Sequence, residues 1–268
     1  MEVVTQAEAD AFLSGADSDK AALRRLFTAY ISADKDTVAS ASTRLKARFS
    51  VLDSKVDLDS RDINLSELIP RLCDQYPGDV GIFAPFFLNL IRLKIGEGVF
   101  LPASEPHAYL SGDCLEAMAC SDNVVRAGLT PKLIDKDTLC SMLTYKSGPV
   151  DVLQGETVDS NTRVYAPAVP EFAVNYTQLT ASQNVSLQSV QSTSIVIVVK
   201  GSGSVRIRDD SKSGKQQQVF SPELQDPISL SLGDIFVLHG NHSLYITAGN
   251  EGVVLSRCYC PTGPTSNL

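Results

Sequence analysis

Two side chains in the middle of the chain are of types that bind metals and anions. His107 follows Pro106, whose ring restricts the backbone just before the imidazole. A histidine at a strand end can offer one ring nitrogen to a metal while a neighbouring group holds the other. Arg126 carries a permanent positive charge that can meet a phosphate or the negative charge that develops in a reaction. A structural histidine and a simple salt bridge are the alternative interpretations.

A second pair of histidines lies near the C-terminus, in the sequence VLHGNH. His239 and His242 have suitable chemistry for a metal. A C-terminal β domain that binds a metal or a sugar through this pair is therefore one hypothesis for function. The HGN sequence is also typical of a solvated turn at the end of a hairpin, and this context favours turn residues over ligands.

Composition and charge argue against two classes of partner. The 268 residues are 43% hydrophobic and 20% charged, enough apolar material for one large or two modest domains. The net charge is −8 and the lysines and arginines are scattered, so the sequence shows no basic stripe for nucleic acid. The longest apolar stretch, residues 80–93, contains Pro85 and Asn89 and is too short for a membrane span. We expect neither nucleic acid nor a membrane as a partner.

The cysteines and the first residues indicate the compartment. The six cysteines form neither a CxxC pair nor a dense framework, which is typical of reduced thiols packed as small hydrophobic groups. The first twenty residues lack a basic stretch followed by an apolar core, so they do not resemble a secretory signal. We therefore expect a cytoplasmic protein.

The first part of the chain has the apolar spacing of α-helices. Within residues 6–75, apolar side chains recur at helical intervals, as at Leu23, Leu26 and Phe27. Pro70 is expected to break or kink the last of these helices, because proline has no amide hydrogen to donate.

Further along the chain, short apolar runs separated by glycine indicate strands and tight turns. Residues 90–94 are expected to form a strand, and residues 146–164 a polar loop. Residues 194–200 are expected to form a strand that reverses at the glycine-rich segment 201–203 into a return strand at 204–208. Evenly spaced short strands of this kind favour a small sandwich or a jelly roll.

One block of the sequence is specific enough to indicate a family. Residues 96–132, GEGVFLPASEPHAYLSGDCLEAMACSDNVVRAGLTPK, combine PHAYL-x-GD with E-x-MA-x-SDNVVRAGLTPK. This block resembles the signature of type I phosphomannose isomerases, and residues 76–93 and 163–172 are also similar to that family. The resemblance implies cupin-type jelly-roll domains, a zinc ion and the interconversion of mannose 6-phosphate and fructose 6-phosphate, a sugar phosphate being the partner.

The resemblance also implies roles for individual residues. The zinc-binding histidine of the family falls on His107 and its catalytic arginine on Arg126. A lysine associated with the substrate phosphate falls on Lys132. Glu116 corresponds to a pocket acid, either a proton-transfer group or a residue that orients another group. Tyr109 is a further pocket candidate, for which plain core packing is the alternative.

The resemblance implies a mixed, mainly β fold in three parts. Residues 1–77 would form an α-helical domain, 78–150 the remaining part of a catalytic cupin domain, and 151–268 a C-terminal cupin-like β domain. The family's other zinc ligands, a glutamine, a second histidine and a glutamate, lie on strands that we cannot place in this sequence. One histidine cannot hold zinc firmly, because zinc takes three or four protein ligands.

These observations leave two hypotheses for function. The first is a zinc-dependent mannose-6-phosphate isomerase that feeds GDP-mannose synthesis, present as a truncated chain that corresponds to the C-terminal two-thirds of the family. The second is a non-catalytic truncated homologue that acts as a binding or interaction module.

Overall fold

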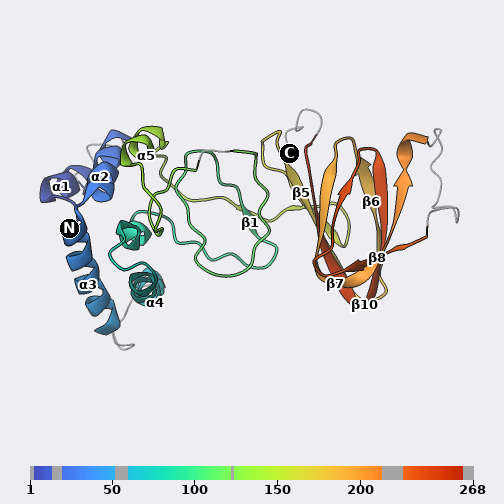
Figure 1. The fold of residues 1–268 in the computed structure, drawn as a ribbon, viewed down its shortest axis with the longest axis horizontal. Coiled ribbons are helices and arrows are strands. Elements are labelled where there is room, and N and C mark those ends of the chain that lie inside the picture. Colours follow the sequence, from blue (N-terminus) through green and yellow to red (C-terminus); the bar gives the residue numbers. More distant parts are fainter. Residues whose placement is uncertain (1–2, 14–19, 52–59, 122–123, 213–225, 262–268) are drawn as a thin grey trace. The chain divides into compact units, whose positions relative to one another are not determined.

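The computed structural model describes residues 3–13, 20–51, 60–121, 124–212 and 226–261 (Figure 1). Its contacts divide the chain into two compact units. Unit 1 comprises residues Met1–Arg92, Leu101–Ser111 and Ser121–Val150, and unit 2 comprises Leu93–Phe100, Gly112–Cys120 and Asp151–Leu268. The expected division into three domains stays a prediction.

Unit 1 contains the described α-helices of the chain. They are α1 (Gln6–Leu13), α2 (Lys20–Ser32), α3 (Lys35–Val51), α4 (Ser60–Gln75) and α5 (Lys136–Met142), and the 3-10 helix η1 (Val80–Phe86) follows α4. The expected helical N-terminal part is therefore confirmed. Among the described helices, none has the length and apolar character that crossing a membrane requires.

The helical core forms where the apolar spacing predicts it. In α2, Phe27, Tyr30 and Ile31 are buried and pack in one cluster with Leu139 and Cys140 of α5. Residues three and four positions apart share one face of a helix, so this spacing turns a single stripe toward the core.

The expected break at Pro70 does not occur. Helix α4 continues from Ser60 to Gln75 with Pro70 inside it. Ile69 and Leu72, on either side of the proline, are fully buried. Burial of these two side chains offsets the lost backbone hydrogen bond, so packing overrides the local preference.

Unit 2 is an antiparallel β structure. Strand β1 (Gly98–Val99) pairs with β2 (Val152–Leu153). The larger sheet contains β3 (Glu156–Thr157), β4 (Thr162–Tyr165), β5 (Ala173–Leu179), β6 (Asn184–Val190), β7 (Ser194–Asp209), β8 (Ile228–Ser231), β9 (Ile235–Leu238) and β10 (His242–Tyr259), and a short 3-10 helix, η2 (Asp210–Lys212), follows β7. The strand order is β3-β4-β5-β10-β7-β8, with β6 paired to β10 and β9 to β7 (Figure 1). The expectation of a mainly β fold is confirmed.

The expected reversal at residues 201–203 is wrong, because β7 runs unbroken through this segment. Gly201 has φ +73°, and a Cβ there would lie 2.1 Å from the carbonyl oxygen of Gly252 in β10. The ladder between the two strands shifts register between Ala248 and Val253, close to this contact. The glycines therefore accommodate a bulge and a close backbone approach, which bend two long strands together.

Two further expectations along the middle of the chain are corrected. Residues 146–164, expected as a loop, contain β2, β3 and the start of β4. Residues 90–94, expected as a strand, are not assigned to one, since no described strand forms a ladder with them. An extended segment becomes a strand only when a neighbour satisfies its backbone groups.

Candidate functional site: an anchored turn between two cations

The carboxylate of Asp79 joins two parts of unit 1 that are distant in sequence. Asp79 precedes η1, and its Oδ1 accepts a hydrogen bond from the amide of Gly81 at 2.6 Å. The same oxygen accepts from the amide of Leu129 at 2.9 Å, and Oδ2 accepts from the amide of Thr130 at 3.1 Å. The segment 128–130, which we call the anchored turn, is thereby attached to the start of η1.

The anchored turn depends on two glycines that touch. Gly128 has φ +142°, and a Cβ there would lie 2.8 Å from the Cα of Gly81. A Cβ on Gly81 would lie 2.6 Å from the amide nitrogen of Leu129. Leu129 itself has φ +51°, a left-handed conformation that side-chain-bearing residues seldom adopt. The sequence Arg-Ala-Gly-Leu-Thr therefore has a structural reason for its glycine.

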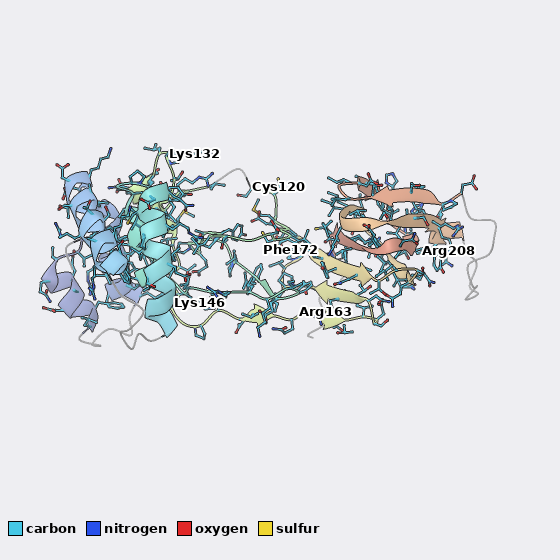
Figure 2. All side chains as sticks on the ribbon, turned by 90° about the horizontal axis from the view of Figure 1, so that it is seen from below. Cys120, Lys132, Lys146, Arg163, Phe172 and Arg208 are labelled. Atoms are coloured by element: carbon cyan, nitrogen blue, oxygen red, sulfur yellow. The ribbon has the colours of Figure 1, made fainter. Side chains whose placement is uncertain are left out.

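The two predicted cations lie on either side of the anchored turn. Arg126 precedes it and Lys132 follows it, and both side chains are exposed (Lys132 is labelled in Figure 2). The backbone amide of Lys132 donates to the hydroxyl of Thr130 at 3.2 Å, which continues the turn toward the lysine. Two cations that flank a rigid turn can together attract a phosphate group.

His107 and Tyr109 form a second local group in unit 1. The rings lie 5.9 Å apart between centroids, and both side chains are exposed. The Nδ1 atom of His107 is 2.9 Å from the carbonyl oxygen of Glu105. When Nδ1 carries the proton and donates to this oxygen, Nε2 is the nitrogen that can meet a metal. The plain core alternative for Tyr109 is disfavoured by its 59% exposure.

The backbone around His107 is held from two sides. The hydroxyl of Thr144 donates to the carboxylate of Glu105. The backbone amide of Thr144 donates to the carbonyl of Ser104 at 3.3 Å. The side chain of Arg71 donates to the carbonyl of Leu110 at 3.4 Å. These contacts come from side chains and loops, since residues 101–110 form no described strand.

Glu116 belongs to unit 2 and is exposed, so its grouping with the residues of unit 1 stays a prediction. His239 is exposed in the connection between β9 and β10, and Nδ1 of His242 is 2.9 Å from the carbonyl oxygen of Gly240. Asn241, between them, has φ +60°, as a tight turn requires. The geometry agrees with the turn interpretation of the HGN sequence.

The described residues do not fit a zinc site by themselves. No group of three or more histidine, cysteine, aspartate or glutamate side chains is close enough to hold a metal within the described ranges. His107 contributes one nitrogen at most, and zinc takes three or four protein donors. A metal at this position requires donors beyond those that the structure describes.

A stretch of unburied apolar side chains surrounds the predicted site residues in sequence. Ile95 is 95% exposed, Met118 71% and Leu133 87%. The same region exposes further large apolar residues, namely Phe86, Leu90, Ile91, Leu93, Leu115 and Val124. Each unit therefore exposes several large apolar side chains close in sequence to the predicted site residues.

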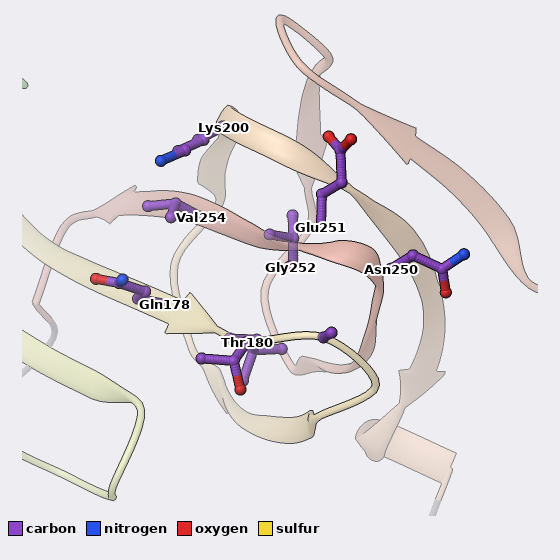
Figure 3. Close-up of a pocket in the computed structure, with 10 residues that line it drawn as sticks. Gln178, Thr180, Lys200, Asn250, Glu251, Gly252 and Val254 are labelled. Carbon is purple, nitrogen blue, oxygen red and sulfur yellow. The ribbon is translucent and has the colours of Figure 1, made fainter.

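Unit 2 has a separate pocket of about 200 Å³ (Figure 3). Gln178, Thr180, Lys200 and Glu251 line it where β5, β7 and β10 meet. The predicted site residues do not line this pocket. It reflects the bulge of β10 near Gly252, and we assign it no chemistry.

The sequence reasoning missed Asp79. A signal for it was present in Tyr-Pro-Gly-Asp-Val-Gly, because an aspartate after a turn and before a helix is a typical N-cap. The cap predicts the contact with Gly81, but not the two contacts with the anchored turn.

Comparisons with known proteins place this arrangement in a family. Residues 1–88 match the family model for the helical insertion domain of type I phosphomannose isomerase. The mannose-6-phosphate isomerase of Cryptococcus neoformans is 45% identical over 193 residues, which cover 70% of this chain and 44% of the relative. The Rattus norvegicus mannose-6-phosphate isomerase is 38% identical over 251 residues, covering 91% of this chain and 56% of the relative.

Solved structures agree with the sequence comparison. The R274A mutant of phosphomannose isomerase from Salmonella typhimurium has a TM-score of 0.62 at 26% identity, covering 95% of this chain and 58% of that protein. A zinc-bound mannose 6-phosphate isomerase has a TM-score of 0.59 at 25% identity, covering 96% and 58%. The expected cupin-type fold is confirmed by these neighbours.

The chain spans about half the length of the curated relatives that it matches. Sequence identity, the helical family model and the structural neighbours nevertheless all indicate the same group of proteins. The chain is therefore similar to type I phosphomannose isomerases along most of its length, and its residues 1–88 match the helical insertion domain of that family.

Proposed function

We propose that this chain carries the phosphate-binding part of a mannose-6-phosphate isomerase, which interconverts D-mannose 6-phosphate and D-fructose 6-phosphate and feeds GDP-mannose synthesis. The observation that carries the proposal is the anchored turn with Arg126 and Lys132 on either side, within the family signature. The printed names of the relatives support the reaction.

The reaction moves one proton between neighbouring carbons of the sugar. A base removes the proton from C2 of the aldose while O1 takes up a proton, which gives an enediol; a proton is then returned to C1 while the C2 hydroxyl loses its proton, which gives the ketose. Arg126 is proposed to stabilise the negative oxygen that develops, and Lys132 to hold the phosphate. Glu116 is proposed as a proton-transfer or orienting acid, and Tyr109 as a substrate contact.

His107 is proposed as the contribution of this chain to a zinc site. The support is its exposed imidazole, with Nδ1 near the carbonyl of Glu105, and the zinc-bound structural neighbour. The described donor set does not hold zinc alone, and we derive no reaction step through the metal.

We further propose that activity requires polypeptide corresponding to the part of the relatives that this chain does not match. Ile95 and Leu133, which flank the site residues in sequence, are almost fully exposed. The same additional polypeptide would bury these side chains and bring the remaining metal donors.

A coupled assay for fructose 6-phosphate formation tests the proposal. The 268-residue chain would be compared with a fusion in which the unmatched segment of the Cryptococcus neoformans relative is joined to it, both with added zinc. We expect turnover in the fusion, its loss in the Arg126→Ala fusion, and a lower zinc content in the His107→Ala fusion. A fusion that folds and binds zinc without turnover would contradict the proposal.

The non-catalytic alternative rests on the small number of metal donors, since the described residues do not form a complete metal site. A binding module would bind fructose 6-phosphate without converting it. Calorimetric binding of fructose 6-phosphate to a fusion that shows no turnover would favour this alternative.

A further inference from the structure

We propose that Asp79 is a positioning residue for the substrate phosphate, acting through the anchored turn that separates Arg126 from Lys132. The inference rests on the proposed function, because that proposal assigns Lys132 to the phosphate and Arg126 to the negative oxygen that develops on the same substrate. Asp79 itself need not touch the substrate. Its carboxylate holds the backbone amides of Leu129 and Thr130, which lie between the two cationic residues in sequence.

Other capping aspartates in unit 1 show why Asp79 is unusual. Asp34 accepts from the amide and hydroxyl of Thr37, and Asp135 accepts from the amide and hydroxyl of Thr138. Both sets of contacts are local and complete one helix start. Asp79 makes one such local contact, and its other two recorded contacts cross 50 and 51 positions of sequence to reach the anchored turn.

The attachment point of the anchored turn is itself rigid. The hydroxyl of the buried Tyr30 donates to the carbonyl of Val80 at 2.8 Å, which ties the start of η1 to helix α2. Ile82, two residues further on, is fully buried. The turn is therefore fastened to a helix start that is packed against the core.

The anchored turn also requires outside contacts to keep its conformation. Gly128 and Leu129 both have positive φ, and Leu129 adopts this conformation against its ordinary preference. Hydrogen bonds from successive amides to a carboxylate are stronger than those to a neutral acceptor and can hold such a backbone. Without the carboxylate, the turn relaxes and the spacing between the two cations becomes variable.

Amide hydrogen exchange on the 268-residue chain tests this directly. We expect the amides of Leu129 and Thr130 to exchange faster in Asp79→Ala. In the isosteric Asp79→Asn, the oxygen that remains can still accept from Leu129, so the Thr130 amide should lose more protection. Asp34→Ala is the matched control, because it removes a cap of the same kind and should leave both amides unchanged. Unchanged exchange in both Asp79 variants would overturn the proposal.

Phosphate affinity provides the functional half of the test. Calorimetric titration with inorganic phosphate and with fructose 6-phosphate should show about tenfold weaker binding in Asp79→Ala, the size expected for one charged hydrogen-bond contact. Asp79→Asn should restore part of the affinity, and Asp34→Ala should bind as the wild type does. Faster exchange with unchanged phosphate affinity would overturn the positioning role.

The two proposals fail in different ways. A wild-type chain, and a wild-type fusion, that bind neither phosphate nor fructose 6-phosphate would refute the assignment of Lys132 to the phosphate. The exchange rates of the Leu129 and Thr130 amides would then still decide whether Asp79 holds the turn.

Discussion

Gly128→Ala is the substitution whose effect can be worked out most directly from the structure. The new Cβ would lie 2.8 Å from the Cα of Gly81, 3.0 Å from its amide nitrogen and 3.2 Å from Oδ1 of Asp79. Backbone atoms cannot move aside as a flexible side chain can. Gly148 is a matched control in the same unit, because its φ is +124° and a Cβ there would meet no heavy atom of the described chain within 4 Å.

The two variants share one cost and differ in a second. Each places a side chain at a positive φ, which costs about 1–3 kcal/mol. Gly128→Ala adds the overlap with Gly81, and overpacking of this kind costs about 1–3 kcal/mol. We therefore expect Gly148→Ala to lower the free energy of unfolding by about 1–3 kcal/mol and Gly128→Ala by about 2–6 kcal/mol.

Urea unfolding followed by far-ultraviolet circular dichroism at the helical wavelength provides the measurement. The described α-helices all lie in unit 1, so this signal reports the unit that contains both glycines. Fructose 6-phosphate affinity should fall in Gly128→Ala and stay unchanged in Gly148→Ala. Equal losses of stability in the two variants would refute the close contact between Gly81 and Gly128.

Three other perturbations have expected outcomes. Arg257 is fully buried, and its guanidinium donates to Ser194 and to the carbonyl of Gln188 while Nη2 has no partner within the described chain, so Arg257→Ala should lower unit 2 stability by about 2–5 kcal/mol in calorimetry through the cavity it leaves, whereas Arg257→Met fills most of that volume and should cost less. Burial and the charge of Asp79 raise the pKa of Tyr30, so its stabilising contribution is present below its ordinary value of 10.0 and is lost as pH rises above it. Alkaline loss of the helical signal should therefore be smaller in Tyr30→Phe, at a cost of about 1 kcal/mol at neutral pH. Hydrogen bonds from the amide and hydroxyl of Thr138 lower the pKa of Asp135, so its contribution is present above its ordinary value of 3.8 and is lost as pH falls. An Asp135→Asn chain should show less acid destabilisation in pH titrations of the helical signal.

Local pattern was sufficient wherever one segment decides its own structure. The apolar stripe of α2 predicted a helix, and Phe27 and Tyr30 are buried as that stripe requires. The strand expected at residues 194–200 was likewise recognisable, and it lies within β7. Propensity and periodicity act over a few residues, and these elements need nothing more.

Prediction failed where a distant partner decides the outcome. Gly201 suggested a reversal, but Gly252 of β10 lies against it and turns the glycine into a close-contact residue of a long strand. Residues 90–94 have the composition of a strand, yet no described segment pairs with them. A strand is a property of two segments, so the pattern of one cannot establish it.

The candidate site shows the same division between local and distant information. His107, Arg126 and Lys132 were identified through a signature that is continuous in sequence. Asp79 was missed, because its recorded contacts with the anchored turn bridge about fifty positions that no spacing rule connects. A sequence signature thus reveals candidate catalytic and binding residues more readily than it reveals the residues that hold them in position.

Exposed apolar side chains occur close in sequence both to segment 90–94, which joins no described ladder, and to the residues predicted for the incomplete metal site. In sequence, Ile95 of unit 2 lies just after segment 90–94, and Leu133 of unit 1 lies just after the cation Lys132. Leaving such side chains in water costs about 25 cal/mol per Å² of apolar surface, which a strand laid over them would recover. Since zinc needs more donors than His107 supplies, we expect that polypeptide which completes the proposed metal site also covers at least one of these exposed side chains.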